Sequence, residues 1–186
     1  MQTGSSFWIL TFLISLFAVN TQAQTLKFNA NKTFKIVQFT DVHYIQGDLR
    51  SEGVLQNIGA IVDTEKPDLV FFTGDVIFGK PAEEGMRAVV EVISSRKIPF
   101  AVTFGNHDDE HELSREKLLE IIQTIPHNLT ATTPGISGVT NFILPVQSSN
   151  STKPACILYS FDSNAYSTIE GIGGYDYIKS DQIGWY

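Results

Sequence analysis

The sequence predicts an α/β fold built around a parallel β-sheet. Three short apolar runs alternate with stretches of helical period in the order β-α-β-α-β-α, which is typical of parallel strands joined by right-handed crossovers. Each apolar run ends in glycine, carboxylate, amide or imidazole side chains, at the position where open α/β sheets bind their ligands. The pattern then changes to two strands joined by a short polar loop, so we expect a β pair to follow.

The three expected parallel strands are almost wholly apolar, as strands covered on both faces are; they span 34–39, 68–73 and 99–104. We expect Ser51-Glu52 to cap the first helix, which stops at Lys66-Pro67. The second helix spans about 82–95, and the third follows a capping Ser114. The residues expected to face inward are Val54, Leu55, Ile58, Ile61 and Val62, then Met86, Val89, Val90 and Ile93, then Leu118, Leu119, Ile121, Ile122 and Ile125.

The rest of the chain is expected to form an antiparallel pair and a further helix. Residues 24–33 form a polar lead-in, and 126–138 form a turn-rich linker. Residues 141–146 and 155–161 are expected to be strands, because their polar connection is short enough for a hairpin. A new helical pattern begins at Ser180 and stops at Tyr186, so we expect the chain to be a fragment of a longer domain.

Composition excludes some partners. The chain has 186 residues, enough for one domain with a core, and a net charge of −7. This charge disfavours nucleic-acid backbones and anionic membranes, so we expect no nucleic-acid-binding surface. An acidic protein can still bind phosphate when metal ions supply the positive charge. The single cysteine, Cys156, lies in an apolar run and cannot form an intrachain disulfide.

Residues 1–23 are predicted to be a signal peptide. They carry no charged side chain, and their apolar run from Phe7 to Val19 is too short to span a bilayer comfortably. Thr21-Gln22-Ala23 places small residues at the two positions that a signal peptidase reads. We therefore expect a secreted or extracytoplasmic product, residues 24–186, with no stable membrane span. An uncleaved membrane anchor is the alternative, because the segment lacks Lys and Arg.

The ends of the three strands offer metal ligands. Asp41 and His43 lie two residues apart, so in extended backbone both point the same way. Asp75 follows a glycine that leaves room for a second ion, and its two carboxylate oxygens can bridge two cations, with Asn106 on the second. Oxygen and imidazole donors without thiolates suit Mn, Fe or Zn. We expect two divalent metal ions, which together bind a phosphoryl oxygen and activate a water.

The residues after Asn106 are candidates for proton transfer. His107 is expected to face the same space and to protonate the leaving oxygen, with Asp108 orienting its imidazole. Glu110 and His111 are expected to form a solvated lead-in to a helix, with a substrate contact as the alternative. Asp162 ends the last strand, where it either starts an Asx-turn or shapes the rim of the site. Four arginines are predicted to be surface charges: Arg50, Arg87, Arg96 and Arg115.

The blocks Asp41-Val42-His43, Gly74-Asp75 and Gly105-Asn106-His107-Asp108 resemble the first three signature blocks of the calcineurin-like metallophosphoesterases. Gly174 to Gln182 is similar to a segment of the branch related to purple acid phosphatases, and the resemblance covers about residues 34–186. It implies the N-terminal half of a metallophosphoesterase-like αββα sandwich. It also implies that Asp41 and His43 bind one metal, Asp75 bridges, Asn106 binds the other, and His107 donates the proton.

Two departures from the family pattern bear on function. Phe78 stands where the purple enzymes carry a metal-binding tyrosine, so a pair of divalent ions is expected rather than an Fe(III)-tyrosinate centre. The family takes further histidine ligands from later blocks, whereas no histidine follows His127. The expected function is hydrolysis of small phosphomonoesters by a metal-activated water, in a site that a missing C-terminal half completes. Two alternatives stay open: a phosphodiesterase or nucleotide hydrolase with the same dinuclear site, and a catalytically inactive, truncated protein that binds a metal or a partner.

Overall fold

The computed structural model describes residues 24–186, so the predicted signal peptide, residues 1–23, lies outside the described part of the chain. Within 24–186, no helix combines the length and the apolar character needed to cross a membrane. The elements follow in the order β1 (Ile36–Phe39), α1 (Val54–Glu65), β2 (Leu69–Thr73), α2 (Ala82–Ser94), β3 (Phe100–Thr103), α3 (Arg115–Gln123), β4 (Phe142–Gln147), β5 (Pro154–Ser160) and α4 (Ser180–Trp185).

The first three strands form a parallel sheet in the order β1-β2-β3, and β4 and β5 form a separate antiparallel pair. The register places Phe39 beside Phe72 and Thr73 beside Thr103, so the three strands end at nearly the same level. The predicted β-α-β-α-β-α order and the hairpin are confirmed. Strand bounds differ from the expected ones by at most two residues, which is the usual scatter at element ends.

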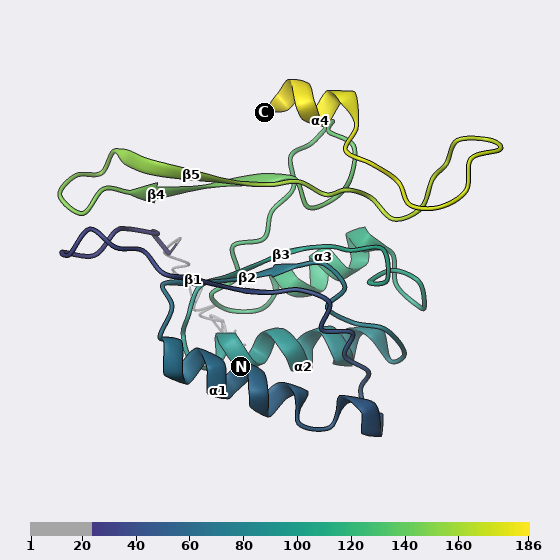
Figure 1. Ribbon diagram of the computed structural model, residues 1–186, viewed down its shortest axis with the longest axis horizontal. Helices are drawn as coiled ribbons and strands as arrows, with labels where there is room; N and C mark the ends of the chain where they lie inside the picture. The colour runs from purple at the N-terminus through teal and green to yellow at the C-terminus, as the bar shows by residue number, and fades with distance from the viewer. Residues whose placement is uncertain (1–23) are drawn as a thin grey trace, which may run out of the picture.

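The elements stack in layers. Figure 1 shows α1 and α2 on one side of the parallel sheet, the β4–β5 hairpin on the other, and α4 beyond the hairpin. Side chains of α3 join those of α2 in the same buried cluster. This arrangement agrees with the predicted N-terminal half of an αββα sandwich.

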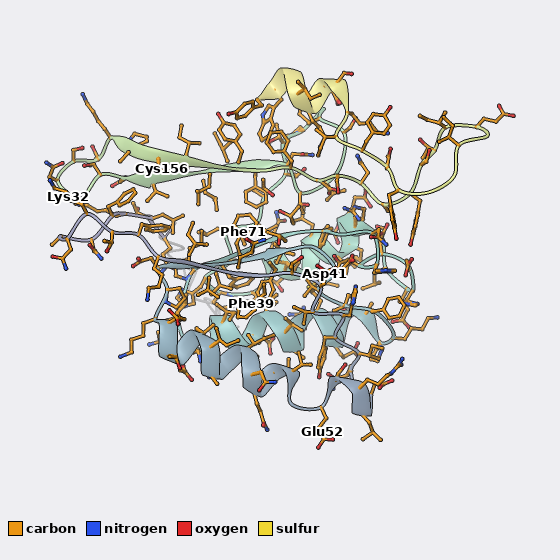
Figure 2. The ribbon with its side chains drawn as sticks, in the orientation of Figure 1. Lys32, Phe39, Asp41, Glu52, Phe71 and Cys156 are labelled. Carbon is orange, nitrogen blue, oxygen red and sulfur yellow. The ribbon has the colours of Figure 1, made fainter. Side chains whose placement is uncertain are left out.

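β2 and β3 are largely buried on both faces, since alternate residues of a strand point to opposite sides. The edge strand β1 is only partly covered, with Ile36 40% exposed, so the expectation that it is covered on both faces is wrong. Phe72 and Val102 face the helices, whereas Phe71 faces the hairpin, where its ring stacks on Phe142 at a centroid distance of 6.1 Å. Figure 2 labels Phe39 on the helix side and Phe71 on the hairpin side. The helix-side core includes Ile58, Val62, Met86, Val89, Val90, Ile93, Leu118 and Ile122. The hairpin-side core contains Leu26, Leu69, Ala101, Phe142, Leu144 and Val146.

The start of α1 differs from the expectation. Its N-cap is Gly53, with a φ of 81°, and Ser51 belongs to a short 3-10 turn, Leu49–Ser51. The Ser51 hydroxyl accepts a hydrogen bond from the Ile45 N–H at 2.9 Å, so it serves the preceding loop and cannot cap the helix. Ile61, expected to face inward, is 44% exposed, because the buried stripe of α1 runs along Ile58 and Val62. The prediction that Ser114 caps α3 is confirmed by its bond from the Lys117 N–H.

The segment expected to be a polar lead-in is part of the hairpin layer. Leu26 is buried in the hairpin-side core. The Gln147 N–H donates to the Leu26 carbonyl, and the Phe28 N–H donates to the Gln147 carbonyl, both at 2.9 Å. The sequence signal is weak because only alternate residues of this short stretch are apolar. Part of the predicted linker, residues 126–138, also pairs with a strand, since the Leu129 N–H donates to the carbonyl of Phe100 in β3.

Candidate functional site

The loops that follow the three parallel strands lie side by side. The Asp41 N–H donates to the Gly74 carbonyl at 3.1 Å, and the His43 N–H donates to the Asp75 carbonyl at 2.9 Å. The pairing between β1 and β2 therefore continues beyond the strands into the loops that carry the candidate ligands.

Three of the predicted metal ligands open onto one pocket. Asp41, Asp75 and Asn106 line a cavity of about 220 Å³ at the carboxyl ends of the strands. The opposite wall comes from the loop after β5, including Asn164, Tyr175 and Asp176. Figure 2 labels Asp41 at this end of the parallel sheet. The structure thus brings together side chains that lie up to 65 residues apart in the sequence, between Asp41 and Asn106.

A second grouping centres on Asp75. Donor atoms of His43, Asp75 and His107 all lie within 4.8 Å of one another. His43 Nε2 is 3.3 Å from Asp75 Oδ2, and the His107 backbone N–H donates to Asp75 Oδ1 at 2.9 Å. Asp75 is only 9% exposed and belongs to both groupings, so its carboxylate lies between the Asn106 side and the histidine side of the site. Sequence reasoning expected His107 only as a proton donor, but its imidazole lies within this cluster of possible ligands.

These residues fit divalent cations. They offer carboxylate and amide oxygens and imidazole nitrogens, the donors that Mn, Fe and Zn accept, and Asp75 is nearly buried with an imidazole beside it. The Asp75 carboxylate faces both groupings, so this donor set fits divalent cations.

The backbone at three of these residues adopts an uncommon conformation. Asp41, His43 and Asp75 have φ values of 51°, 48° and 53°, in the left-handed region that side chains with a Cβ rarely occupy. Such backbone persists only when surrounding contacts enforce it, and it clusters at functional sites. The expectation that Asp41 and His43 point the same way from extended backbone is therefore wrong: Asp41 lines the pocket, whereas His43 belongs to the grouping with Asp75 and His107.

Gly105 is required by the position of the Asp75 carboxylate. A Cβ at residue 105 would lie 2.1 Å from Asp75 Oδ1 and 2.5 Å from the Asp75 backbone nitrogen. Gly74 is similarly close to Gly105, since its Cβ would lie 3.0 Å from the Gly105 Cα, and its φ is 106°. The two glycines therefore allow the second and third loops to touch.

Asp108 has a different role from the expected one. Its Oδ1 accepts from the N–H groups of Val76 and Ile77, and its Oδ2 accepts from those of Asp75 and Gly105, at 2.8–3.0 Å. The carboxylate is 2% exposed. Burial raises its pKa to about 6, although the backbone donors favour the charged form. Asp108 thus fixes the backbone of two loops, and the expectation that it orients the His107 imidazole is wrong.

Glu110 makes the contact that Asp108 was expected to make. His107 Nδ1 and Glu110 Oε2 are 2.6 Å apart, and this hydrogen bond raises the pKa of His107 above its ordinary value. Tyr166, from the loop after β5, donates to the other oxygen of Glu110 and accepts from Asn106 Nδ2. Glu110 is therefore engaged on both oxygens, rather than belonging to a solvated lead-in. Sequence reasoning missed Tyr166, since nothing in its loop marks it.

Arg115 was expected on the surface and is buried. It is 8% exposed and donates to the carbonyls of Phe104 and Gly105 and to the buried carboxylate of Asp162. Although burial acts in the opposite direction, the Arg115 charge and nearby backbone donors hold the pKa of Asp162 below its usual range. The pair supports the turn that presents Asn106. The sequence contains one indication of this role: Arg115 lies in the first turn of α3, where a cation is unfavourable to the helix dipole unless another contact holds it.

Of the two roles expected for Asp162, the structure shows the Asx-turn, whereas the side chain is too deeply buried to line the pocket. The Asn164 N–H donates to Asp162 Oδ1, which is the predicted Asx-turn. Its Oδ2 accepts from the backbone N–H groups of Val139 and Thr140, and the side chain is fully buried. It therefore anchors the start of the loop that forms the far wall of the pocket.

Phe78 lies where a metal-binding tyrosine was considered. Its ring packs edge-on against His107 at a centroid distance of 4.7 Å and against His111 at 5.5 Å, and it tilts against His43 at 5.7 Å. It provides an apolar wall for the histidine side of the site and offers no ligand atom.

Comparison with known proteins finds phosphoesterases and phosphatase-like relatives. The model of the family described as calcineurin-like phosphoesterase matches residues 34–179. Phosphatase DCR2 of Saccharomyces cerevisiae is 37% identical over 88% of this chain and 32% of its own length. Probable inactive purple acid phosphatases 29 and 14 of Arabidopsis thaliana are 29% and 28% identical over 93% and 87% of this chain, and over 51% and 47% of their own lengths. The chain thus spans from about a third to about half the length of these relatives.

Proposed function

Because this chain belongs to the calcineurin-like phosphoesterase family, we propose that it carries the N-terminal share of a metal-dependent phosphomonoesterase site. The observation that carries the proposal is the convergence at Asp75. Its carboxylate faces the pocket shared with Asp41 and Asn106 and also lies within reach of His43 and His107. The family implies divalent metals, and the donor set favours Mn, Fe or Zn.

In this proposal Asp41 and His43 would hold one divalent cation, Asn106 would hold the other, and Asp75 would be available to both. When bound, the metals supply polarisation of a phosphoryl oxygen and a water of lowered pKa. His107 carries a proton toward the leaving oxygen at Nε2, because Nδ1 is occupied by Glu110. The hydrogen bond to Glu110 raises the pKa of His107, which favours the protonated ring that this role needs. Asp108 and Arg115 act on the loop backbone and touch no reactant.

Further ligands are needed for a complete dinuclear site. The chain has four histidines, and the last is His127. We propose that the remaining ligands come from a C-terminal half of the domain, as the longer relatives allow, and that the substrate is a small phosphate ester. We further propose that residues 1–23 are a cleaved signal peptide, that residues 24–186 form part of a phosphoesterase domain, and that the product is secreted.

A second candidate function is binding without turnover. Two relatives carry names that call them probable inactive purple acid phosphatases, which favours this candidate. A protein of this kind would bind a metal ion or a partner at the pocket without hydrolysing phosphate esters.

One experiment separates the two candidates. The product of the longest reading frame that contains this sequence is incubated with Mn²⁺ or Zn²⁺ and an aryl phosphate, beside Asp75→Asn and the exposed control Asp63→Asn. Metal-dependent hydrolysis that Asp75→Asn abolishes and Asp63→Asn retains supports the enzyme. Calorimetric binding of metal without hydrolysis supports the inactive candidate, and hydrolysis that survives Asp75→Asn contradicts the proposed site.

A further inference from the structure

A chain of side-chain hydrogen bonds connects the two halves of the site. Asn106 Nδ2 lies 3.1 Å from the Tyr166 hydroxyl, which is bonded to Glu110 Oε1. Glu110 Oε2 in turn lies 2.6 Å from His107 Nδ1. Tyr166 comes from the loop after β5, whereas the other three residues follow β3. The contact crosses 60 residues of sequence between Asn106 and Tyr166.

The direction of each bond in this chain is determined by chemistry. An ionised carboxylate only accepts hydrogen bonds, so the Tyr166 hydroxyl must donate to Glu110 and His107 must carry its proton on Nδ1. The single hydroxyl proton of Tyr166 is then used, so its oxygen accepts from the Asn106 amide. The group on Asn106 that faces Tyr166 is therefore the NH₂. Among residues 24–186, the amide oxygen of Asn106 and Nε2 of His107 are the atoms of these two groups that this hydrogen-bond chain leaves unused.

The surroundings of Tyr166 argue against a role in the core. The side chain is 43% exposed. Its ring stacks on Tyr175 at a centroid distance of 5.9 Å, and Tyr175 lines the pocket. The loop is closed on itself by bonds from the Ser167 N–H to the Gly174 carbonyl and from the Asp176 N–H to the Ala165 carbonyl. Tyr166 therefore contributes its hydroxyl to the site and little to the apolar core.

We propose that Tyr166, through Glu110, is a positioning residue that sets which atoms of Asn106 and His107 face the pocket. It fixes the Asn106 amide with its oxygen free, the only atom of that group able to bind a cation, and it supports the His107 tautomer with Nε2 free. The proposal rests on the proposed function, since it assigns the purpose of these orientations to metal binding and proton transfer. It gives a positioning role to a residue of the loop after β5, which also forms the opposite wall of the pocket.

The test uses the purified chain and two readouts. The first is calorimetric titration with Mn²⁺ of the wild type, Tyr166→Phe and Tyr186→Phe; Tyr186 is an exposed tyrosine whose ring packs on Tyr159. Loss of a hydrogen bond that orients a metal ligand lowers metal affinity by about 10- to 100-fold. We expect this loss in Tyr166→Phe, no change in Tyr186→Phe, and the same thermal unfolding temperature in all three proteins.

The second readout needs no metal and so separates the two proposals. Long-range ¹H–¹⁵N spectra at a pH where the ring is neutral report which nitrogen of His107 carries the proton, and the Asn106 side-chain amide signal reports its hydrogen bond. We expect the Nδ1–H tautomer in the wild type and a shifted Asn106 amide signal in Tyr166→Phe only. A wild-type chain that binds no Mn²⁺ but shows these spectra contradicts the metal site and retains the positioning role. Two spectroscopic results would overturn the proposal: an Nε2–H tautomer of His107, or an Asn106 amide signal that Tyr166→Phe does not change. If the wild type binds Mn²⁺, an equal Mn²⁺ affinity in Tyr166→Phe would overturn it as well.

Discussion

Replacing Asp108 with asparagine is expected to destabilise the protein although the side chain keeps its size. Each carboxylate oxygen of Asp108 accepts two backbone N–H groups. An asparagine side chain offers one oxygen and one NH₂ group, so it can satisfy only two of these four donors. The other two backbone N–H groups would face an amide that also donates, in a part of the molecule that water does not reach, since Asp108 is 2% exposed.

The magnitude follows from the number of bonds lost. A buried donor left without an acceptor costs about 1–3 kcal/mol, so two such donors predict a loss of about 2–6 kcal/mol. This is a large part of the stability of a typical domain, about 5–15 kcal/mol. With a urea dependence of about 2 kcal/mol per molar, the unfolding midpoint should fall by about 1–3 M.

The assay is urea unfolding of the metal-free chain, followed by circular dichroism at pH 8, where the carboxylate is charged because its pKa is about 6. Asp63→Asn is the matched control, since Asp63 forms an exposed ion pair with Arg96 whose loss should cost no more than about 1 kcal/mol. A midpoint for Asp108→Asn close to that of the control would refute the backbone role. A shifted His107 titration with unchanged stability would instead support the role that the sequence first indicated.

Two substitutions and one titration test other parts of the site. Gly105→Ala places a Cβ 2.1 Å from an oxygen of Asp75, so we expect a loss of about 1–3 kcal/mol in urea unfolding and weaker Mn²⁺ binding by calorimetry. Arg115→Met leaves its buried carboxylate partner unpaired and should cost about 3–5 kcal/mol in thermal unfolding. The His107 ring should titrate above 6.5 by NMR in the metal-free chain. Because the pKa is raised in the folded state, the stability that this pair contributes is full below about pH 6.5 and is lost as the pH rises through the folded-state pKa.

Each of these predictions has a control. Gly173→Ala introduces a methyl group with no atom within 4 Å, so equal effects at residues 105 and 173 would contradict the steric reasoning. Arg87→Met removes an exposed ion pair and should change stability by less than about 1 kcal/mol. Glu110→Gln should return the His107 pKa toward 6.5, and an unchanged value would exclude Glu110 as the cause.

The layout of the fold was predictable because local patterns and topology agree. The apolar runs around β1, β2 and β3 and the amphipathic stripes of α2 and α3 specify a parallel sheet, and parallel strands bring their carboxyl ends to one edge. The bounds of α1 were less predictable. Ser51 is a good capping residue, but a tertiary contact from Ile45 engages its hydroxyl, and Gly53 begins the helix instead.

The supporting contacts of the site were beyond the reach of sequence reasoning. The three strand-end blocks indicated which side chains meet, because spacing and residue type are local properties. The partners of Asp108 are backbone groups, and Arg115 and Tyr166 contact the site through tertiary packing that leaves no periodic pattern. Only the unusual position of a cation in the first turn of α3 hinted at a buried role for Arg115.

The left-handed backbone at Asp41, His43 and Asp75 has a consequence for how related sequences diverge. Each such residue costs about 1 kcal/mol or more, and glycine would relieve that cost at once. A lineage with no use for cations would gain stability by exchanging these side chains for glycine, so drift should erase the ligands first at these positions. Related sequences that keep an acid, an imidazole and an acid at these three positions would therefore indicate selection for the side chains themselves.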